Sequence, residues 1–306
     1  MVKPVDLSVP IGPKLTLKNP IMNASGTFAY GEEFARFMDL GCLGAVVTKG
    51  LSLQPKRGNP TPRVTEAPSG MLNAIGLENV GLERFLEEKL PFLKGYYVPV
   101  IVNFFGASET EYAHMAARLD QTAVDGLEMN VSCPNVKKGG IQFGRDPHTL
   151  ASLVKIVRGQ TSKPLIVKLS PMTSDMAEMA RSAEEYGADA LTCINTIPAM
   201  AIDEETRRPI LGNVTGGLSG PAIKPVALKM VWEAAKAVRI PVIDAGGISH
   251  ARDAVQFFLA GARACQIGTQ ALVEPFCFSP IIAGIEDYLK RQGVERLTDI
   301  IGALET

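Results

Sequence analysis

A short stretch of the chain, residues 127–135 (LEMNVSCPN), places three side chains together that could take part in chemistry. It begins as an apolar strand and then presents an amide, a hydroxyl and a thiol, Asn130, Ser132 and Cys133, just before a proline. Free cysteine is among the most buried residue types, so packing alone could explain the thiol. A thiol at a strand end beside a long loop instead favours a reaction site, because its thiolate can act as a base or nucleophile.

Several other apolar runs also end in polar residues or glycine. An asparagine amide donates and accepts hydrogen bonds together, which suits a planar heterocycle, and a lysine suits an anion. Glycines before a helix N-terminus let backbone N–H groups approach a phosphate. The set indicates a phosphorylated planar cofactor beside a second small polar ring. FMN fits this description, pyridoxal phosphate on a Schiff-base lysine (Lys49 or Lys168) is the competitor, and the strand ends alone do not separate the two. These run ends carry Ser25, Lys49, Asn103, Asn130 with Cys133, Lys168, Asn195 with Thr196, Gly246 with Gly247, and Gly268 with Thr269.

Eight apolar runs have to position these groups. Each is nearly continuous in apolarity and amphipathic segments lie between them, as expected for parallel strands that are covered on both faces. Eight strand-then-helix units predict an α/β fold, a (β/α)₈ TIM barrel, with residues 1–306 as one domain. An open doubly wound sheet is disfavoured because no G-x-G-x-x-G motif follows the first run. The runs are residues 20–25, 44–50, 98–105, 126–133, 164–170, 190–196, 241–247 and 264–269.

Three long insertions follow predicted strands 2, 4 and 6, at residues 51–79, 134–147 and 197–220. Strand-to-helix loops lie at the C-terminal face of a barrel, where barrel enzymes have their active sites. Without clear secondary structure of their own, loops of this length fit lids or a partner surface. Asp125 and Glu128 could be read as an acid pair, but their spacing puts them on opposite faces of a strand, so no chemistry is assigned to them.

The overall composition excludes several classes of protein. The chain has 306 residues and a net charge of −1, with no acidic or basic block, which argues against nucleic acid or anionic lipid as the main partner. No run approaches the length of a membrane span, and no signal peptide is evident, so a cytoplasmic protein is expected. Its five cysteines include no C-x-x-C pair, and Cys42, Cys193, Cys265 and Cys277 are interpreted as packing residues. No metal site is predicted.

Seven motifs in order make the sequence resemble the dihydroorotate dehydrogenase family. The form of the first two is similar to the class 1B catalytic subunit, whereas the membrane-attached class 2 enzymes use a serine base. The resemblance extends from residue 23 to residue 272. The motifs are NVSCPNVKKGG (130–140), NAIGLEN (73–79), TKG (48–50), VKLSP (167–171), INT (194–196), GGLSGPAIKP (216–225) and DAGGI (244–248).

This resemblance implies flavin-dependent oxidation of (S)-dihydroorotate to orotate in de novo pyrimidine (UMP) biosynthesis. Cys133 matches the family's base, which takes the C5 proton while a hydride passes from C6 to FMN N5. Because an ordinary thiol has a pKa of about 8.5, activity is expected to rise with pH toward that value. Lys168 is expected near the N1/C2=O edge of the flavin, where negative charge develops on reduction.

The resemblance also implies a set of binding residues. The substrate would be held by Lys49, Asn73, Ala74, Ile75, Gly76, Leu77, Asn130, Asn195 and Thr196. The flavin would be held by Ser25, Lys49, Gly50, Asn103, Asn130, Lys168, Ile194, Gly220, Gly246, Gly247, Gly268 and Thr269.

Class 1B relatives pass electrons to NAD through a second subunit with FAD and an iron–sulfur (2Fe–2S) cluster. This sequence has no motif for either cofactor, which fits a need for that partner, and a homodimer core with two partner subunits, a heterotetramer, is implied. Two further activities stay open: a class 1A-like enzyme that reduces fumarate, and a dihydropyrimidine dehydrogenase subunit that acts on dihydrouracil or dihydrothymine. A barrel that only binds a ligand is a third alternative.

Overall fold

The computed structural model describes residues 5–131 and 143–305, and within them eight parallel strands form a barrel. The hydrogen-bonded order is β3-β16-β15-β10-β9-β8-β7-β4, so neighbours in space are mostly neighbours in sequence. All eight lie on the predicted runs, except that β16 begins two residues earlier; the (β/α)₈ prediction is confirmed. The strands are β3 (Ile21–Asn23), β4 (Val46–Val47), β7 (Val100–Phe104), β8 (Gly126–Asn130), β9 (Leu165–Lys168), β10 (Ala190–Cys193), β15 (Val242–Asp244) and β16 (Ala262–Ile267).

The barrel closes between its first two strands largely through one side chain. Met22 and Ala45 form a parallel bridge, and the N–H of Gly44 donates to the carbonyl of Ile21 at 2.8 Å. Beyond them the buried amide of Asn23 takes the place of a backbone partner: it accepts from the N–H of Val47 at 3.0 Å and donates to the carbonyl of Val47 at 2.6 Å.

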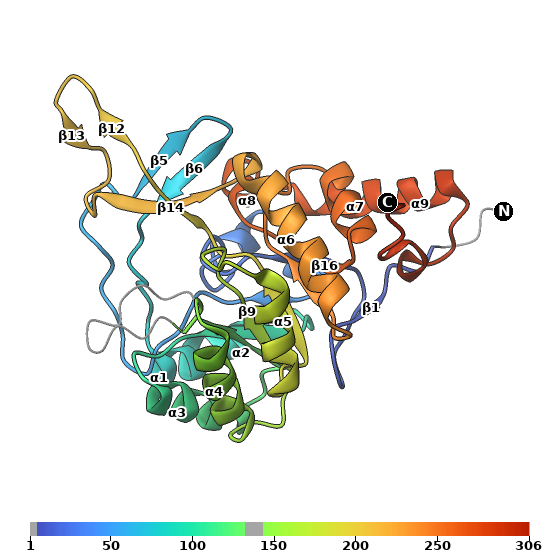
Figure 1. The fold of residues 1–306 in the computed structure, drawn as a ribbon, viewed down its shortest axis with the longest axis horizontal. Coiled ribbons are helices and arrows are strands. Elements are labelled where there is room, and N and C mark those ends of the chain that lie inside the picture. Colours follow the sequence, from blue (N-terminus) through green and yellow to red (C-terminus); the bar gives the residue numbers. More distant parts are fainter. Residues whose placement is uncertain (1–4, 132–142, 306) are drawn as a thin grey trace.

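Helices surround the barrel and bury their apolar faces against it (Figure 1). Their starts follow from capping chemistry: Ser108 accepts from the N–H of Glu111, and Asp146 and Asp175 do the same for their helices. The hydroxyl of Thr173 in turn accepts from the N–H of the N-cap Asp175 at 3.2 Å. The helices are α3 (Glu109–Asp120), α4 (Pro147–Arg158), α5 (Met176–Glu185), α6 (Lys224–Ala237), α7 (Ala251–Leu259), α8 (Thr269–Val273) and α9 (Phe278–Gln292).

The first two units depart from the regular pattern. Between β3 and β4 the chain forms only two 3₁₀ turns, η1 (Phe34–Arg36) and η2 (Leu40–Cys42). After β4 one continuous helical stretch passes from α1 (Leu82–Arg84) through a π-helical segment, η3 (Phe85–Lys89), to α2 (Leu90–Lys94). The N-terminal strands β1 (Val9–Pro10) and β2 (Thr16–Leu17) form a separate hairpin, and η4 (Pro221–Ile223) and η5 (Leu297–Ile300) complete the 3₁₀ turns.

Insertions one and three do have secondary structure, so the prediction of loops without it is wrong for both. They pair with each other in an antiparallel sheet, β11-β14-β6-β5, which stands apart from the barrel helices in Figure 1. A small β12–β13 hairpin extends from it. The second insertion lies mostly outside the described residues. The strands are β5 (Val64–Ala67), β6 (Gly70–Asn73), β11 (Ile197–Met200), β12 (Ile202–Asp203), β13 (Arg208–Pro209) and β14 (Thr215–Ser219).

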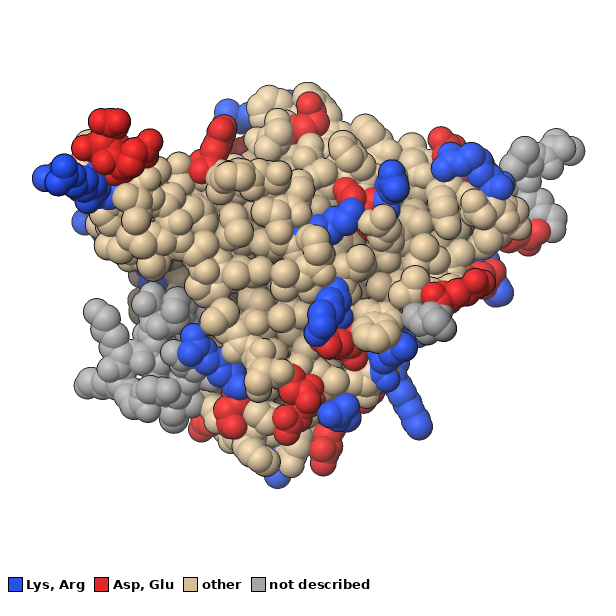
Figure 2. Space-filling model, turned by 45° about the horizontal axis from the view of Figure 1, so that its top comes forward, with Lys and Arg blue, Asp and Glu red and all other residues tan. Residues whose placement is uncertain are grey.

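The surface carries charges of both signs without a block of either. Figure 2 shows lysine and arginine side chains next to aspartate and glutamate side chains over much of the visible face. Within residues 5–131 and 143–305, no helix combines the length and apolar character that crossing a bilayer requires.

Candidate active site

A cavity of about 520 Å³ opens at the carboxyl ends of the barrel strands. Its size is that of a site for a small molecule or cofactor. Among the described residues that line it are six asparagines and three cationic side chains, Lys49, Arg145 and Lys168, and none that is acidic. This lining favours an anionic ligand with many hydrogen-bonding groups.

Asn103 and Lys168 lie at the barrel side of the cavity, on β7 and β9. Both are nearly or fully buried. The amide nitrogen of Asn103 donates to Glu128 at 2.6 Å, whereas its oxygen Oδ1 has no partner among the described residues. A buried amide oxygen without a partner costs free energy, so its presence in the lining points to a ligand N–H. Lys168 Nζ donates to Gln266 at 3.2 Å and has a further donor available.

Glycine backbone forms another part of the lining, near the ends of β14, β15 and β16. Gly220 and Gly247 both have positive φ, 88° and 84°, which favours glycine. A Cβ on Gly247 would lie 2.7 Å from the carbonyl oxygen of Gly220, and one on Gly246 would lie 2.1 Å from Cβ of Ala227. The hydroxyl of Thr269 donates to Ser219 at 2.8 Å beside them. These close approaches require glycine at both positions, and backbone without a Cβ in a cavity lining is what close approach to a phosphate needs.

The helices behind this glycine backbone differ in length. The α7 helix after β15 has nine residues, whereas the α8 helix after β16 has only five. A helix thus follows both strands, as expected, and the start of α8 (Gly268, Thr269) is part of the lining. Because α8 is short, Gly268 and Thr269 contribute backbone and hydroxyl groups rather than a long helix dipole.

Residues 73–77 form a third part of the lining. Asn59 holds this segment: it donates to the carbonyl of Ala74 at 3.0 Å through its side chain, and to that of Ile75 through its backbone. The backbone N–H groups of Ile75, Gly76 and Leu77 have no acceptor in the described part of the chain. Three consecutive free N–H groups at a cavity wall suit a carboxylate.

Lys49 lies in the cavity wall, where burial lowers the pKa of its ammonium group, although nearby Glu78 opposes the shift. Asn130 and Asn195 are neighbours in the wall: the Asn195 amide donates to Asn130 at 3.3 Å, and its own oxygen accepts from the N–H of Thr196 at 2.7 Å. The uncompensated positive charge of Lys49 would be stabilised by an anionic ligand.

The structure brings together all predicted binding residues that it describes. Every one of the substrate and flavin residues named from the sequence, from Ser25 to Thr269, lines this cavity. The candidate base Cys133 and its neighbour Ser132 lie outside the described residues. The other four cysteines are free thiols away from the lining, and burial raises the pKa of Cys277 to about 12.

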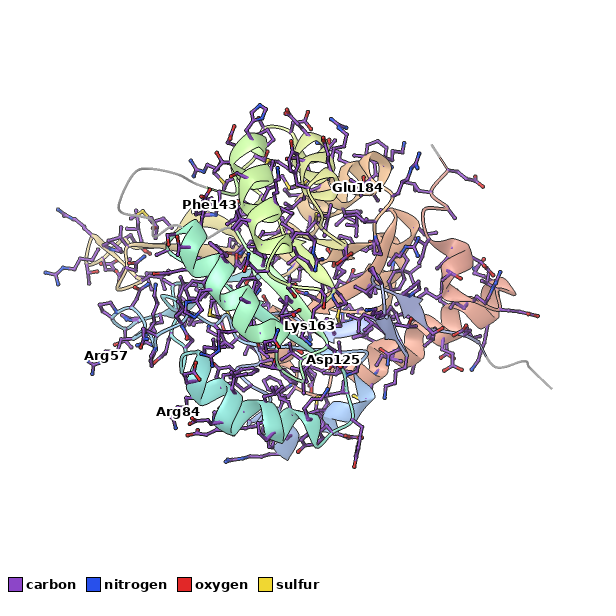
Figure 3. All side chains as sticks on the ribbon, turned by 90° about the horizontal axis from the view of Figure 1, so that it is seen from below. Arg57, Arg84, Asp125, Phe143, Lys163 and Glu184 are labelled. Atoms are coloured by element: carbon purple, nitrogen blue, oxygen red, sulfur yellow. The ribbon has the colours of Figure 1, made fainter. Side chains whose placement is uncertain are left out.

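The sequence analysis missed a polar cluster beneath the cavity. Glu128, to which no chemistry was assigned, is fully buried inside the barrel and contacts Asn103, Thr192 and Gln266. Asp125 lies just before β8, where it accepts from Lys94 at 2.9 Å, and Figure 3 shows it near Lys163. The available signal was a charged residue within a continuous apolar run, which has to be paired when it is buried.

Fold and cavity define a (β/α)₈ barrel whose cavity, at its C-terminal face, has a lining suited to an anionic, hydrogen-bonding ligand. The family model described as dihydroorotate dehydrogenase matches residues 9–289. Relatives in Trichlorobacter lovleyi (57% identical, 98% of both chains) and Geotalea daltonii (56% identical, 100% of both) are named dihydroorotate dehydrogenase B (NAD(+)), catalytic subunit. The structure of an Eimeria tenella dihydroorotate dehydrogenase with ferulenol shares the fold (TM-score 0.79, 23% identity, 97% and 88% coverage).

The chain therefore belongs to the dihydroorotate dehydrogenase family. Within that family it groups with the catalytic subunits of the B type, which confirms the resemblance found in the motifs.

Proposed function

We propose that this chain is the catalytic subunit of an NAD-linked dihydroorotate dehydrogenase, which oxidises (S)-dihydroorotate to orotate in pyrimidine biosynthesis. The observation that carries the proposal is the cavity: all described residues that match the family's binding motifs line it, with cationic and amide side chains and no acid among them. As an enzyme of nucleotide synthesis it would work in the cytoplasm, with residues 1–306 as one FMN-binding unit.

FMN fits the described residues. The unpartnered oxygen of Asn103 can accept from the single N–H of the oxidised flavin ring, Lys168 can face its polar edge, and the backbone of Gly246 and Gly247 can hold a phosphate. When bound, FMN supplies a two-electron acceptor for the oxidation. Ser25, Gly50, Asn130, Ile194, Gly220, Gly268 and Thr269 complete the proposed cofactor set.

The substrate would lie toward residues 73–77. The three free N–H groups of Ile75, Gly76 and Leu77, with Lys49, provide an anion site for the orotate carboxylate. The amides of Asn73, Asn130 and Asn195 and the hydroxyl of Thr196 offer both donors and acceptors to the ring. Ionic and amide contacts of this kind orient the substrate and exclude an analogue that lacks the carboxylate.

Cys133 is proposed as the base that removes the C5 proton. This role comes from the match to the family's motif, since Cys133 is outside the described residues. The other cysteines are poor alternatives, because burial raises the pKa values of Cys193, Cys265 and Cys277 and Cys42 is outside the cavity lining. A thiolate must form before the proton can be taken, so the rate should rise with pH through the pKa of the thiol.

The catalytic subunit needs an electron outlet. The relatives' names include both a catalytic subunit and NAD(+), so we propose a separate partner that carries FAD and a 2Fe–2S cluster, and a heterotetramer of two plus two. With such a partner, NAD rather than fumarate is the final acceptor.

Anaerobic titration of the purified yellow protein tests the activity. Dihydroorotate should bleach the flavin absorbance, and dihydrouracil should not; the opposite result would favour a dihydropyrimidine dehydrogenase. Reoxidation by fumarate would indicate the class 1A-like alternative, whereas reoxidation by NAD only after the partner is added supports the proposal. Absence of bleaching by any of these substrates would overturn it.

Two cysteine variants test whether Cys133 acts as a base rather than as a binding residue. Cys133→Ala should retain FMN and lose at least about a hundredfold in the rate of bleaching, because proton abstraction by a positioned base contributes roughly 10²–10⁴-fold. Cys42→Ala, at a half-buried thiol outside the cavity lining, is the matched control and should keep the wild-type rate. Full activity in Cys133→Ala would remove this residue from the mechanism.

A further inference from the structure

A fully buried carboxylate, Glu128, lies in the barrel interior directly beneath the cavity. It is on β8, and one of its contacts is with Gln266 on β16. In the sheet order these strands are four positions apart in a ring of eight, so they face each other across the barrel. Glu128 itself is absent from the cavity lining, whereas Asn103, Lys168 and Gln266 are part of it.

Four donors converge on this carboxylate. Its Oε1 accepts from the amide of Asn103 at 2.6 Å and lies 3.6 Å from the Lys168 ammonium. Its Oε2 accepts from the Thr192 hydroxyl at 2.8 Å and from the Gln266 amide at 2.5 Å. An ionised carboxylate only accepts hydrogen bonds, so this arrangement suits the charged form.

The carboxylate determines which way the two amides point. If the Asn103 amide were turned over, its oxygen would face Oε1 of Glu128, acceptor against acceptor, so the NH₂ group must point down and Oδ1 up. The NH₂ group of Gln266 likewise points to Glu128, so its oxygen faces Lys168 Nζ, from which it accepts at 3.2 Å. The register supports the first contact, because Asn103 and Glu128 are paired residues on adjacent strands.

Glu128 also balances the charge of Lys168, the lysine that is buried in the described part of the chain. Asp244, fully buried on β15, is the other interior acid near Lys168, but neither of its oxygens has a hydrogen-bond partner in the described structure. No ion pair joins Asp244 to Lys168 among the described residues, whereas Oε1 of Glu128 lies 3.6 Å from the ammonium nitrogen. The ammonium group of Lys168 is therefore paired with Glu128 alone among these acids.

We propose that Glu128 is a positioning residue for the flavin: it fixes the Asn103 oxygen as an acceptor for the flavin ring N–H and balances the charge of Lys168 below the ring. The proposal rests on the proposed function only in that FMN is the ligand. It assigns to Glu128 an effect on cofactor recognition and on redox potential without contact with FMN.

The test compares FMN with 3-methyl-FMN, in which the ring N–H is replaced by N–CH₃, on the full-length apoprotein by fluorescence quenching. Wild type should bind FMN at least tenfold more tightly than the methyl analogue. Glu128→Gln can no longer orient Asn103, so its preference should fall to about threefold or less. Glu205→Gln, an exposed glutamate, is the matched control and should keep the wild-type preference.

The midpoint potential of bound FMN is an independent readout. Removal of the negative charge leaves Lys168 uncompensated and favours the reduced, more negative flavin, so the potential of Glu128→Gln should rise. A tenfold change in the ratio of oxidised to reduced flavin is about 30 mV for this two-electron couple. A residue that only filled space would leave both the preference and the potential unchanged.

Each outcome decides the matter. If wild type binds FMN and Glu128→Gln keeps both the preference and the potential, the role of Glu128 is refuted while the proposed function stands. Failure of wild type to bind FMN refutes the proposed function itself. If Glu128→Gln does not fold, Glu128→Gln/Lys168→Met removes both buried charges together, and a wild-type preference in that variant overturns the proposal.

Discussion

The closure of the barrel by Asn23 leads to a quantitative prediction about stability. Its amide satisfies both the N–H and the carbonyl of Val47, at 3.0 and 2.6 Å, and no atom of Asn23 is exposed. Asn23→Ala would leave two buried backbone groups without partners. Each costs roughly 1–3 kcal/mol, so the free energy of unfolding should fall by about 2–6 kcal/mol. Water entering the new space would give a value near the lower limit.

Urea unfolding followed by circular dichroism measures this change. Asn213→Ala is a useful control, because Asn213 is exposed and its single hydrogen bond, to the carbonyl of Thr215, spans two residues in a turn. The control should differ from wild type by less than about 0.5 kcal/mol. A loss below about 1 kcal/mol in Asn23→Ala would refute the argument that this side chain substitutes for a strand pair.

The same substitution should weaken cofactor binding. Residues 24–27 follow Asn23 directly and line the cavity, so an open seam between β3 and β4 would loosen one wall. Asn23→Ala should bind FMN more weakly than wild type does when both are measured well below their unfolding temperatures. Equal FMN affinity would show that the wall is held by other contacts, for instance the bond from the N–H of Ala24 to the carbonyl of Ile267 at 2.7 Å.

Three further predictions concern the site. Gly217→Ala places a Cβ 2.0 Å from the Thr196 hydroxyl, so the KM for dihydroorotate should rise at least about tenfold at unchanged FMN content. Gly159→Ala is the control, because its Cβ would meet its nearest neighbour at an ordinary 3.4 Å, and its steady-state kinetics should equal those of wild type. Asp244→Asn should stabilise the protein by on the order of 1–4 kcal/mol at pH 7. Because the pKa of Asp244 is raised in the folded state, wild type loses stability as pH rises above the unfolded-state pKa of about 3.9. The stability advantage of Asp244→Asn over wild type, measured by urea unfolding, should therefore vanish below that pH. Asp253→Ala should lower the free energy of unfolding by about 1–2 kcal/mol at pH 7. Burial raises the pKa of Asp253, but hydrogen bonds from Lys224 and from the N–H groups of Ser249 and His250 outweigh it and lower the pKa. The loss in Asp253→Ala should therefore disappear as pH falls through that lowered pKa.

The strands were predictable from sequence because each is buried on both faces and reads as a nearly continuous apolar run. The insertion sheet was not, since β14 (TGGLS) has two glycines and pairs with β6 across more than 140 residues of sequence. Neither strand has the alternating pattern that marks a half-buried strand. The missing helix in the first unit has a similar cause: two 3₁₀ turns leave no helical periodicity to detect.

The site residues at strand ends were predictable because polar groups after apolar strands must converge on one barrel face. Glu128 was not, because it was only set on the face opposite Asp125 and given no chemistry. In an open sheet that is covered by helices on both sides, both faces of a strand are apolar, so a charged side chain on either face would lack a polar partner. In a closed barrel one face is the interior, and polar groups from opposite strands, here Glu128 and Gln266, can satisfy each other at the axis.

The insertion sheet changes the interpretation of two of the three long segments. Asn73 at the end of β6 pairs with Gly217 on β14, and two residues further on Ser219 bonds to Thr269. The proposed substrate side and the proposed phosphate side of the cavity are thus attached to the same two strands. The glycines of β14 are needed for this, because a Cβ on Gly216 would lie 2.6 Å from the carbonyl oxygen of Asn73. A sheet attached to both sides of the cavity can fix the orientation of the two ligands relative to each other. Catalysis between two bound molecules requires such fixed orientation more than a moving lid at this position.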